Sequence, residues 1–274
     1  MVTVIIPSLA SEVTKPYLKL TVESLRATTD WPIIVVTNGT KHKPDLKDIK
    51  GITTHLHTPT QGQGIATNYG AQLASTDYLL ISNDDMYYAP DWNKNLRFES
   101  LCFSPNLVEP INNAGSAPPF EKLDAGFNLE EFNQYRVDGF VIDMLLANRR
   151  MKEPIQENGF NFPVFIKKDL WNFLKGYDIT YDPWGSNGDT DLQTRINLAG
   201  VTPMRLRDVL VYHFSNKSGT FDGTHQDFYQ HNIEYFKFKF GFDRDELKSD
   251  VWYNKDMIPT DPAKIKYKQE KYND

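Results

Sequence analysis

The fold is decided by Tyr78-Leu79-Leu80-Ile81-Ser82-Asn83-Asp84-Asp85, a short apolar run that ends in an amide and two adjacent carboxylates. Two earlier runs, residues 2–6 and 32–37, are also apolar and are also followed by polar residues. Between these runs, residues 17–25 and 65–73 carry apolar side chains at roughly helical spacing. Strands that alternate with helices in this way predict βαβ units around a mostly parallel sheet.

The residues that follow the three runs are the first candidates for a functional site. In an open sheet of parallel strands, ligands bind beyond the carboxyl ends of the strands. That place is taken here by Pro7 and Ser8, by Asn38, and by residues 83–85. We therefore expect a ligand crevice at this edge of the sheet.

Length and composition indicate a globular protein with one large domain. The chain has 274 residues, a mean hydropathy of −0.52 and a formal net charge of −6 with interspersed signs, which disfavours nucleic-acid binding. Cys102 is the only cysteine, so an intrachain disulfide is excluded. No apolar stretch is long enough to cross a membrane, and we expect a cytoplasmic protein.

The rest of the chain has a less regular pattern. Prolines at positions 105, 110, 118 and 119 interrupt residues 101–159, where we expect loops and one strand at 139–144. Farther on, we expect a strand at 161–166, helices at 168–174 and 190–198, a strand before His213, and a helix at 225–240. The lysine-rich residues after 261 are expected to form a loosely packed surface tail.

Asp84 and Asp85 suit a hard divalent cation, which prefers oxygen ligands. Such an ion could bridge phosphate oxygens and neutralise charge on a departing nucleoside diphosphate. The alternative is a polar turn in which either aspartate caps a helix. His213 ends another apolar run, and a neutral imidazole there could complete the metal site, although an isolated histidine is more often a hydrogen-bonded structural residue.

A second acidic motif lies in the glycine-containing stretch 184–192. Asp189 could remove a proton from an acceptor hydroxyl, or it could be a helix N-cap. Asp191 is a candidate acceptor contact, although we expect it mainly to be a favourable charge in the first helical turn. Lys217 follows His213 on a polar loop, where a cation suits a pyrophosphate.

The stretch 61–68 contains two glycines at the entry to a predicted helix, and its N–H groups could face a phosphate or a ribose. An ordinary helix entry is the alternative. The glycine spacing does not fit the dinucleotide fingerprint, which disfavours an enzyme that uses a nicotinamide cofactor.

The order of residues 4–7, 35–39, 64–70 and 83–85 resembles glycosyltransferase family 2, which has the Rossmann-like GT-A fold. The resemblance spans residues 1 to about 220. It implies an inverting transfer from a nucleoside diphosphate sugar to a hydroxyl acceptor such as a glycan, with Mn²⁺ or Mg²⁺ as cofactor. Asp85 and His213 are then the metal ligands, and Asp189 is the catalytic base. The implied donor-binding residues are Pro7, Ser8, Asn38, Gly64, Asn68, Asn83, Asp84 and Lys217.

Two positions depart from the family pattern. Asn38 stands where members often have an aspartate that contacts the nucleotide base, which leaves the choice of base open. Gly188 replaces the usual glutamate before Asp189. For the acceptor, Asn161, Phe162 and Trp184 are candidates, with simple core packing as the alternative for the aromatic residues.

The expected organisation is a GT-A catalytic domain at 1–220 and a helical extension with a tail at 221–274. Within the domain, residues 1–100 would bind the nucleotide sugar and residues 101–220 the acceptor. The extension would close over the donor or form an oligomer contact. Two alternatives are a catalytically silent nucleotide- or glycan-binding module and a sugar-phosphate nucleotidyltransferase. The second is disfavoured because no glycine-rich basic loop follows the first run.

Overall fold

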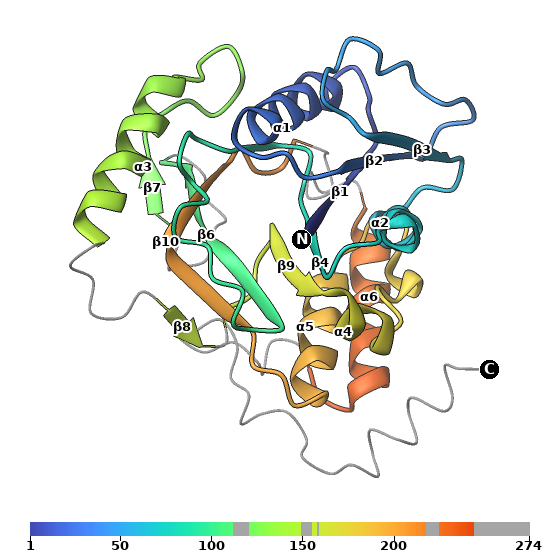
Figure 1. Ribbon diagram of the computed structural model, residues 1–274. Helices are drawn as coiled ribbons and strands as arrows, with labels where there is room; N and C mark the ends of the chain where they lie inside the picture. The colour runs from blue at the N-terminus through green and yellow to red at the C-terminus, as the bar shows by residue number, and fades with distance from the viewer. Residues whose placement is uncertain (112–120, 149–154, 158, 218–224, 244–274) are drawn as a thin grey trace.

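The computed structural model describes residues 1–111, 121–148, 155–157, 159–217 and 225–243 (Figure 1). Its centre is a ten-stranded sheet with the order β3-β2-β1-β4-β9-β6-β10-β5, to which β7 adds beside β6 and β8 beside β10. The first elements are β1 (Val2–Ser8), α1 (Thr14–Thr28), β2 (Ile33–Asn38), β3 (Thr54–Thr58), α2 (Gln63–Leu73) and β4 (Tyr78–Ile81).

The second group of elements extends the sheet and covers one of its faces. It contains β5 (Met86–Tyr87), β6 (Cys102–Pro110), β7 (Glu121–Leu123), α3 (Gln134–Asn148), β8 (Ile155–Glu157), β9 (Val164–Lys167), α4 (Lys168–Phe173), the 3-10 helix η1 (Ile179–Tyr181), α5 (Gly188–Leu198), β10 (Met204–His213) and α6 (Gln226–Phe240).

The predicted α/β fold is confirmed, and the sheet contains antiparallel as well as parallel pairs of strands. Strands β1, β2, β3 and β4 are parallel. Strand β9 runs antiparallel between β4 and β6, so β6 and its parallel neighbour β10 return to the direction of β4. The carboxyl ends of β1, β2, β4, β6 and β10 therefore lie at one edge of the sheet, where we expected the ligand crevice.

Helices cover both faces of this sheet (Figure 1). On one face, Leu18 and Val22 of α1 pack against Ile6 and its neighbours. On the other face, α2, α4 and α5 pack against a cluster that contains Ile5. Adjacent residues of β1 thus serve opposite cores, because successive side chains of a strand point to opposite faces. Full burial of each such aliphatic side chain contributes roughly 1.5–3 kcal/mol.

The strand predicted at 139–144 is wrong, because these residues lie within α3. Val137 and Val141 are one helical turn apart and are both buried in a cluster with Leu210 and Tyr212 of β10. The spacing of the buried side chains, rather than the local run of β-branched residues, decides the structure here.

The sequence pattern also did not predict β6, because Pro105 and Pro110 were expected to break regular structure. All nine residues of β6 are buried. Pro105 pairs with Leu206 immediately before the register between β6 and β10 shifts. A proline has no N–H for the ladder, and such an irregularity tolerates it.

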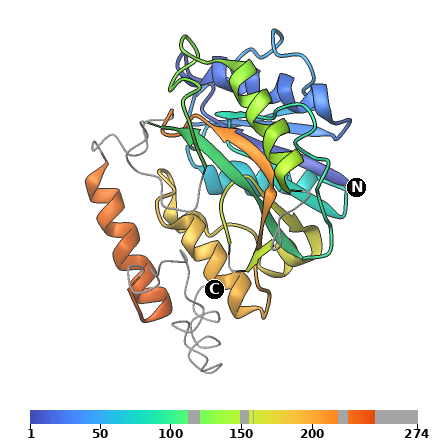
Figure 2. The same ribbon diagram turned by 90° about the vertical axis from the view of Figure 1, so that its left-hand side faces the viewer.

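The remaining predicted elements agree with the structure. Strands at 2–6, 32–37, 161–166 and before His213, and helices at 168–174, 190–198 and 225–240, correspond to β1, β2, β9, β10, α4, α5 and α6 within a few residues at their ends. Helix α6 lies on the α5 side of the sheet (Figure 2). The predicted surface tail after residue 261 lies outside the described residues. Among the described helices, none is long and apolar enough to cross a membrane.

Candidate functional site

Asp85 and His213 are brought together by a two-residue antiparallel ladder. His213, the last residue of β10, pairs with Met86 of β5, and the Phe214 N–H donates to the Asp85 carbonyl at 3.0 Å. The side chains meet as well, with 3.3 Å between His213 Nε2 and an Asp85 carboxylate oxygen. The structure thus places next to each other the two residues that we predicted as metal ligands.

A third acidic side chain, which sequence reasoning missed, contacts the other nitrogen of this histidine. Glu109 lies near the end of β6, and its Oε1 is 3.0 Å from His213 Nδ1. Its second oxygen pairs with Lys122 Nζ at 3.2 Å. The residue was missed because 101–159 was expected to be irregular. The available signal was a lone charged residue within an otherwise apolar run, Leu107-Val108-Glu109-Pro110.

Burial and mutual repulsion perturb the ionisable groups of this cluster. Burial raises the pKa of Asp84 to about 7, with the neighbouring Asp85 charge as the next cause. Burial alone would lower the pKa of His213, but the Asp85 and Glu109 carboxylates outweigh burial and raise it to about 10. Carboxylates gathered in a partly buried site create a field that favours a bound cation.

Ser8 and Asp84 connect the ends of β1 and β4. The Ser8 hydroxyl donates to the Asp84 carboxylate at 2.5 Å and accepts from the Ala10 N–H at 3.0 Å. Pro7 is buried within β1. Asn83 is half-buried beside this pair, at the strand end where we expected it. The predicted donor-side residues of these two strands are therefore neighbours.

Two other predicted donor-binding residues, Asn38 and Asn68, use their polar side chains inside the protein. Asn38 donates to the Ser8 carbonyl at 3.1 Å and accepts from the Gly62 N–H at 3.0 Å. The Asn68 amide forms two 2.9 Å hydrogen bonds with the backbone of Tyr177. These side chains therefore fix the start and the body of α2 in place.

The N–H of Gly64, which we expected to face the donor, donates to the Asp182 carboxylate at 3.1 Å instead. The Ile65 N–H binds the same carboxylate at 2.8 Å. An acidic side chain is favourable at this point because the N-terminus of a helix carries unpaired N–H groups and partial positive charge. The chain itself thus occupies the anion site predicted at the start of α2.

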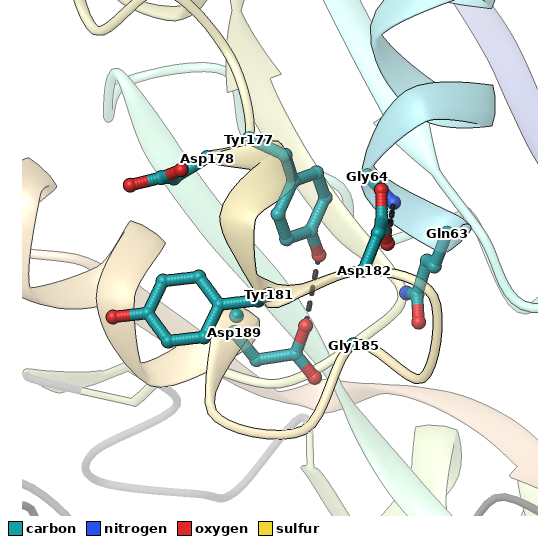
Figure 3. A pocket seen from close by; sticks show the side chains of 9 residues that line it. Gln63, Gly64, Tyr177, Asp178, Tyr181, Asp182, Gly185 and Asp189 are labelled. Carbon is teal, nitrogen blue, oxygen red and sulfur yellow. Dashed lines mark hydrogen bonds between the residues drawn. The ribbon is translucent and has the colours of Figure 1, made fainter. Parts of the chain in front are cut away.

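Asp189 lies in the first turn of α5 and lines a small pocket (Figure 3). Its side chain is exposed, as a proton acceptor for a substrate requires, and it accepts a 2.9 Å hydrogen bond from the Tyr177 hydroxyl. Tyr177 is buried between Phe162 and Trp171. The pocket is lined by Gln63, Gly64, Tyr177, Asp178, Tyr181, Asp182, Gly185, Gly188 and Asp189.

The predicted acceptor contacts are mostly buried. Asp191 is 0% exposed and pairs with Arg195 and Lys239 at 2.5 and 2.6 Å. Asn161 is buried in a network with Arg205 and the Pro105 carbonyl. For these two residues the structure contradicts a direct acceptor contact, because no side-chain surface is offered to a ligand.

Phe162 and Trp184 behave differently from each other. Phe162 is buried and stacks on Tyr177 with 6.0 Å between ring centroids, which supports the core-packing alternative. Trp184 is half-exposed and stacks on His225 with 3.4 Å between centroids. Trp184 therefore remains the aromatic candidate for contact with a sugar face.

Lys217 brings positive charge to the metal-side cluster. Its Nζ lies 3.4 Å from the centroid of the Phe127 ring. Burial lowers the pKa of Lys217, and the charge of Asp85 opposes this shift. The loop after β10 thus holds a cation whose charge acts on Asp85, and the contact of Lys217 with a diphosphate stays a prediction.

Asp85 and His213 could bind a divalent cation if a substrate supplied further ligands. Within the described part of the chain, no three His, Cys, Asp or Glu side chains form a group that could hold a metal ion by themselves. Asp85 and His213 could supply one oxygen and one nitrogen ligand, because these two atoms lie 3.3 Å apart. Mg²⁺ sites in nucleotide-using enzymes commonly combine one or two protein ligands with phosphate oxygens and water.

Comparisons with known proteins identify the enzyme class. Residues 3–97 match the model of Glycosyl transferase family 2, and this segment contains residues 83–85. No curated protein sequence matches the chain. The resemblance predicted from the sequence is confirmed over this segment, and the chain is a glycosyltransferase.

Solved structures confirm the GT-A fold. The S. aureus TarS 1–349 structure is 14% identical with a TM-score of 0.54, over 89% of this chain and 73% of TarS. Its complex with UDP-GlcNAc gives 13% identity, a TM-score of 0.53, and coverage of 89% and 74%. GalNAc-T7 with UDP, GalNAc and Mn²⁺ is 14% identical with a TM-score of 0.57, over 100% of this chain and 54% of that chain.

Proposed function

We propose that this chain is a metal-dependent, inverting glycosyltransferase that moves a monosaccharide from a nucleoside diphosphate sugar to a hydroxyl acceptor such as a glycan. The observation that carries the proposal is the meeting of Asp85 and His213 at the carboxyl edge of the sheet. Similar structures support the donor and the cofactor, because TarS has been solved in complex with UDP and with UDP-GlcNAc, and GalNAc-T7 with UDP, GalNAc and Mn²⁺.

Asp85 and His213 would hold Mn²⁺ or Mg²⁺ together with the diphosphate of the donor. The ion would supply positive charge that offsets the negative charge of the departing diphosphate. Lys217 would add a second positive charge from the loop after β10. Asp84, held by Ser8, would contact the sugar or the ribose.

Transfer would take place in one displacement. The acceptor hydroxyl loses its proton to the Asp189 carboxylate as its oxygen attacks the anomeric carbon. The bond between that carbon and the diphosphate oxygen breaks at the same time, and the diphosphate leaves with the electron pair. Attack from the opposite side inverts the configuration of the anomeric carbon. Tyr177 would hold Asp189 in position through its 2.9 Å hydrogen bond.

The test separates donor binding from chemistry. Isothermal titration with UDP, GDP and dTDP, each with Mn²⁺ and with chelator, should show metal-dependent binding of at least one nucleotide. Asp85→Ala should abolish that binding, whereas Asp189→Asn should keep it within about threefold and lower the turnover of donor and acceptor by roughly 10²–10⁴-fold, the usual contribution of a general base. Equal loss of nucleotide binding in both variants would contradict this division of roles.

A further inference from the structure

Glu109 is a buried carboxylate at the metal side of the site that the proposed chemistry does not yet use. It is 2% exposed, and an ionised carboxylate is costly to bury unless other groups compensate its charge. Its oxygens contact His213 Nδ1 at 3.0 Å and Lys122 Nζ at 3.2 Å. One of its contacts is therefore the imidazole that faces Asp85.

The strand register brings Glu109 to this place. Strands β6 and β10 are parallel, and the last residues that pair between them are Val108 and Tyr212. The next residue on each strand is Glu109 and His213, so two neighbouring backbones fix the separation of these side chains. A hydrogen bond between them does not depend on a mobile loop.

The two ring nitrogens of His213 have different partners. Nδ1 faces Glu109, and Nε2 faces Asp85 at 3.3 Å. A carboxylate can only accept, so Nδ1 carries the proton and donates to Glu109. A metal-binding histidine needs the opposite nitrogen without a proton, and a carboxylate behind the ring holds both its orientation and its tautomer.

We propose that Glu109 is a positioning residue for the metal site, which turns His213 so that Nε2 lies on the Asp85 side and is the atom available to the ion. The inference rests on the proposed metal-dependent function. It assigns to Glu109 a role that acts through His213, without contact with the donor sugar or the acceptor.

The competing explanation is that Glu109 only holds β7 against β6 through Lys122. Lys122 belongs to β7, which pairs with the end of β6, and its side chain is one-third exposed. In that case, removal of either partner of the ion pair would have the same consequence. If Glu109 positions His213, Glu109→Ala should weaken metal binding more than Lys122→Met does, because Lys122→Met leaves the contact between Glu109 and His213 intact.

The experiment compares Glu109→Gln, Glu109→Ala and Lys122→Met with the wild-type enzyme, using as the probe Mn²⁺ in the presence of whichever of UDP, GDP and dTDP the wild type binds. Electron paramagnetic resonance of free Mn²⁺ gives the affinity, and thermal unfolding confirms that each variant is folded. The matched control is Glu157→Gln, which makes the same chemical change on exposed β8, beside the opposite end of β10.

We expect Glu109→Ala to weaken Mn²⁺ binding by about 10- to 100-fold, the usual cost of losing the residue behind a metal ligand. The Mn²⁺ affinity of Glu109→Gln should lie between those of the wild type and Glu109→Ala, because the amide oxygen can still accept from Nδ1 but carries no charge. Lys122→Met and Glu157→Gln should stay within about threefold of the wild type. Nuclear magnetic resonance of ¹⁵N-histidine-labelled protein should show a slowly exchanging His213 Nδ1 proton in the wild type and in Glu109→Gln, but not in Glu109→Ala.

Each other result has a defined meaning. Wild-type affinity for Mn²⁺ in Glu109→Ala, or no protected Nδ1 proton in the wild type, would overturn the role of Glu109 and leave the proposed function intact. Equal weakening in Lys122→Met and Glu109→Ala would reduce Glu109 to a strand contact. If wild-type protein shows no Mn²⁺-dependent binding of any of the three nucleotides, the metal-dependent function itself fails, and this inference fails with it.

Discussion

At the scale of single residues, the hydroxyl of Tyr177 is the clearest contributor to the proposed base. Tyr177→Phe removes the 2.9 Å hydrogen bond to Asp189 and leaves the buried ring in place. We expect kcat to fall about 10-fold, since hydrogen bonds to charged groups contribute roughly 1.5–3 kcal/mol and part of this is retained in the ground state. The KM for the donor should stay within about twofold. Steady-state kinetics give both numbers.

The matched control for that substitution is Tyr235→Phe, which removes a tyrosine hydroxyl 2.8 Å from the Asp178 carboxylate, on α6. It should leave kcat within about twofold. A similar loss of kcat in both variants would mean that Tyr177 acts through general packing and not through Asp189.

His213 gives a prediction on pH dependence. Burial lowers its pKa, but Asp85 and Glu109 raise it to about 10, so the imidazole of the metal-free protein is charged at pH 7. Metal must replace the proton on Nε2, and binding should therefore release about one proton and strengthen as pH rises toward 10. Titrations of Mn²⁺ and UDP at pH 8, in two buffers of different ionisation enthalpy, measure this proton release.

The same shift has a defined sign for stability. A raised pKa in the folded state stabilises the metal-free protein fully below the unfolded value of about 6.5. This contribution decreases as pH rises and is lost as pH passes the folded value of about 10. The free energy of unfolding of the wild type should therefore approach that of His213→Gln between these values. A constant difference between the two proteins over this range would show that the carboxylates do not charge the ring.

At the scale of elements, the start of α2 depends on the absence of a side chain at Gly62. Its φ is +156°, and a Cβ there would lie 2.3 Å from Asp182 Cγ, while Asp182 itself binds the first N–H groups of the helix. Gly62→Ala should lower the free energy of unfolding by about 1–3 kcal/mol through strain and loss of this cap. Urea denaturation measures the change.

The control for that position is Gly139→Ala, in the middle of α3. A Cβ at Gly139 meets no atom within 4 Å, so the substitution should stabilise the protein by roughly 0.5–1 kcal/mol, because alanine loses less backbone entropy in a helix. If Gly62→Ala were neutral, Asp182 would have to move without cost, and the cap would not matter to the fold.

The sequence predicts those elements whose residue pattern alone determines their structure. Strands β1, β2 and β4 are uninterrupted buried runs, and their polar ends are read directly. Whether residues 134–148 form a helix and residues 102–110 a strand depends on contacts with β10. Strand β10 buries one face of α3, and its irregular register with β6 tolerates Pro105. Local patterns contain neither fact.

The candidate site divides in the same way. Asp85 could be found from its place after an apolar run, whereas its meeting with His213 requires the ladder between β5 and β10. Glu109 could not be assigned before β6 was known. Asn38 and Asn68 were predicted to contact a ligand because the sequence does not reveal their partners inside the protein. In the folded chain, these partners are the backbones of Ser8 and Tyr177.

At the scale of the whole molecule, one lysine connects the C-terminal helix to the acidic part of the site. Lys239 of α6 is buried, and its Nζ lies 2.6 Å from both Asp178 and Asp191. Burial raises the pKa of Asp178, but Lys239 outweighs burial and lowers it to about 2. Asp191 follows Asp189 by two residues, so α6 supports the turn that carries the proposed base.

Lys239→Met should therefore affect stability and activity together. Removing one partner of a buried ion pair costs about 3–5 kcal/mol, because the remaining charges are left in the interior. Hydrogen exchange should become faster along α6 and the first turn of α5, and kcat should fall more than the affinity for the nucleotide, since Asp85 and His213 lie on other elements. Lys237→Met, on the exposed side of the same helix with its Nζ 3.9 Å from Asp243, should change stability by less than about 0.5 kcal/mol. Unchanged exchange in α5 after Lys239→Met would show that α6 is only an appendage and does not support the base.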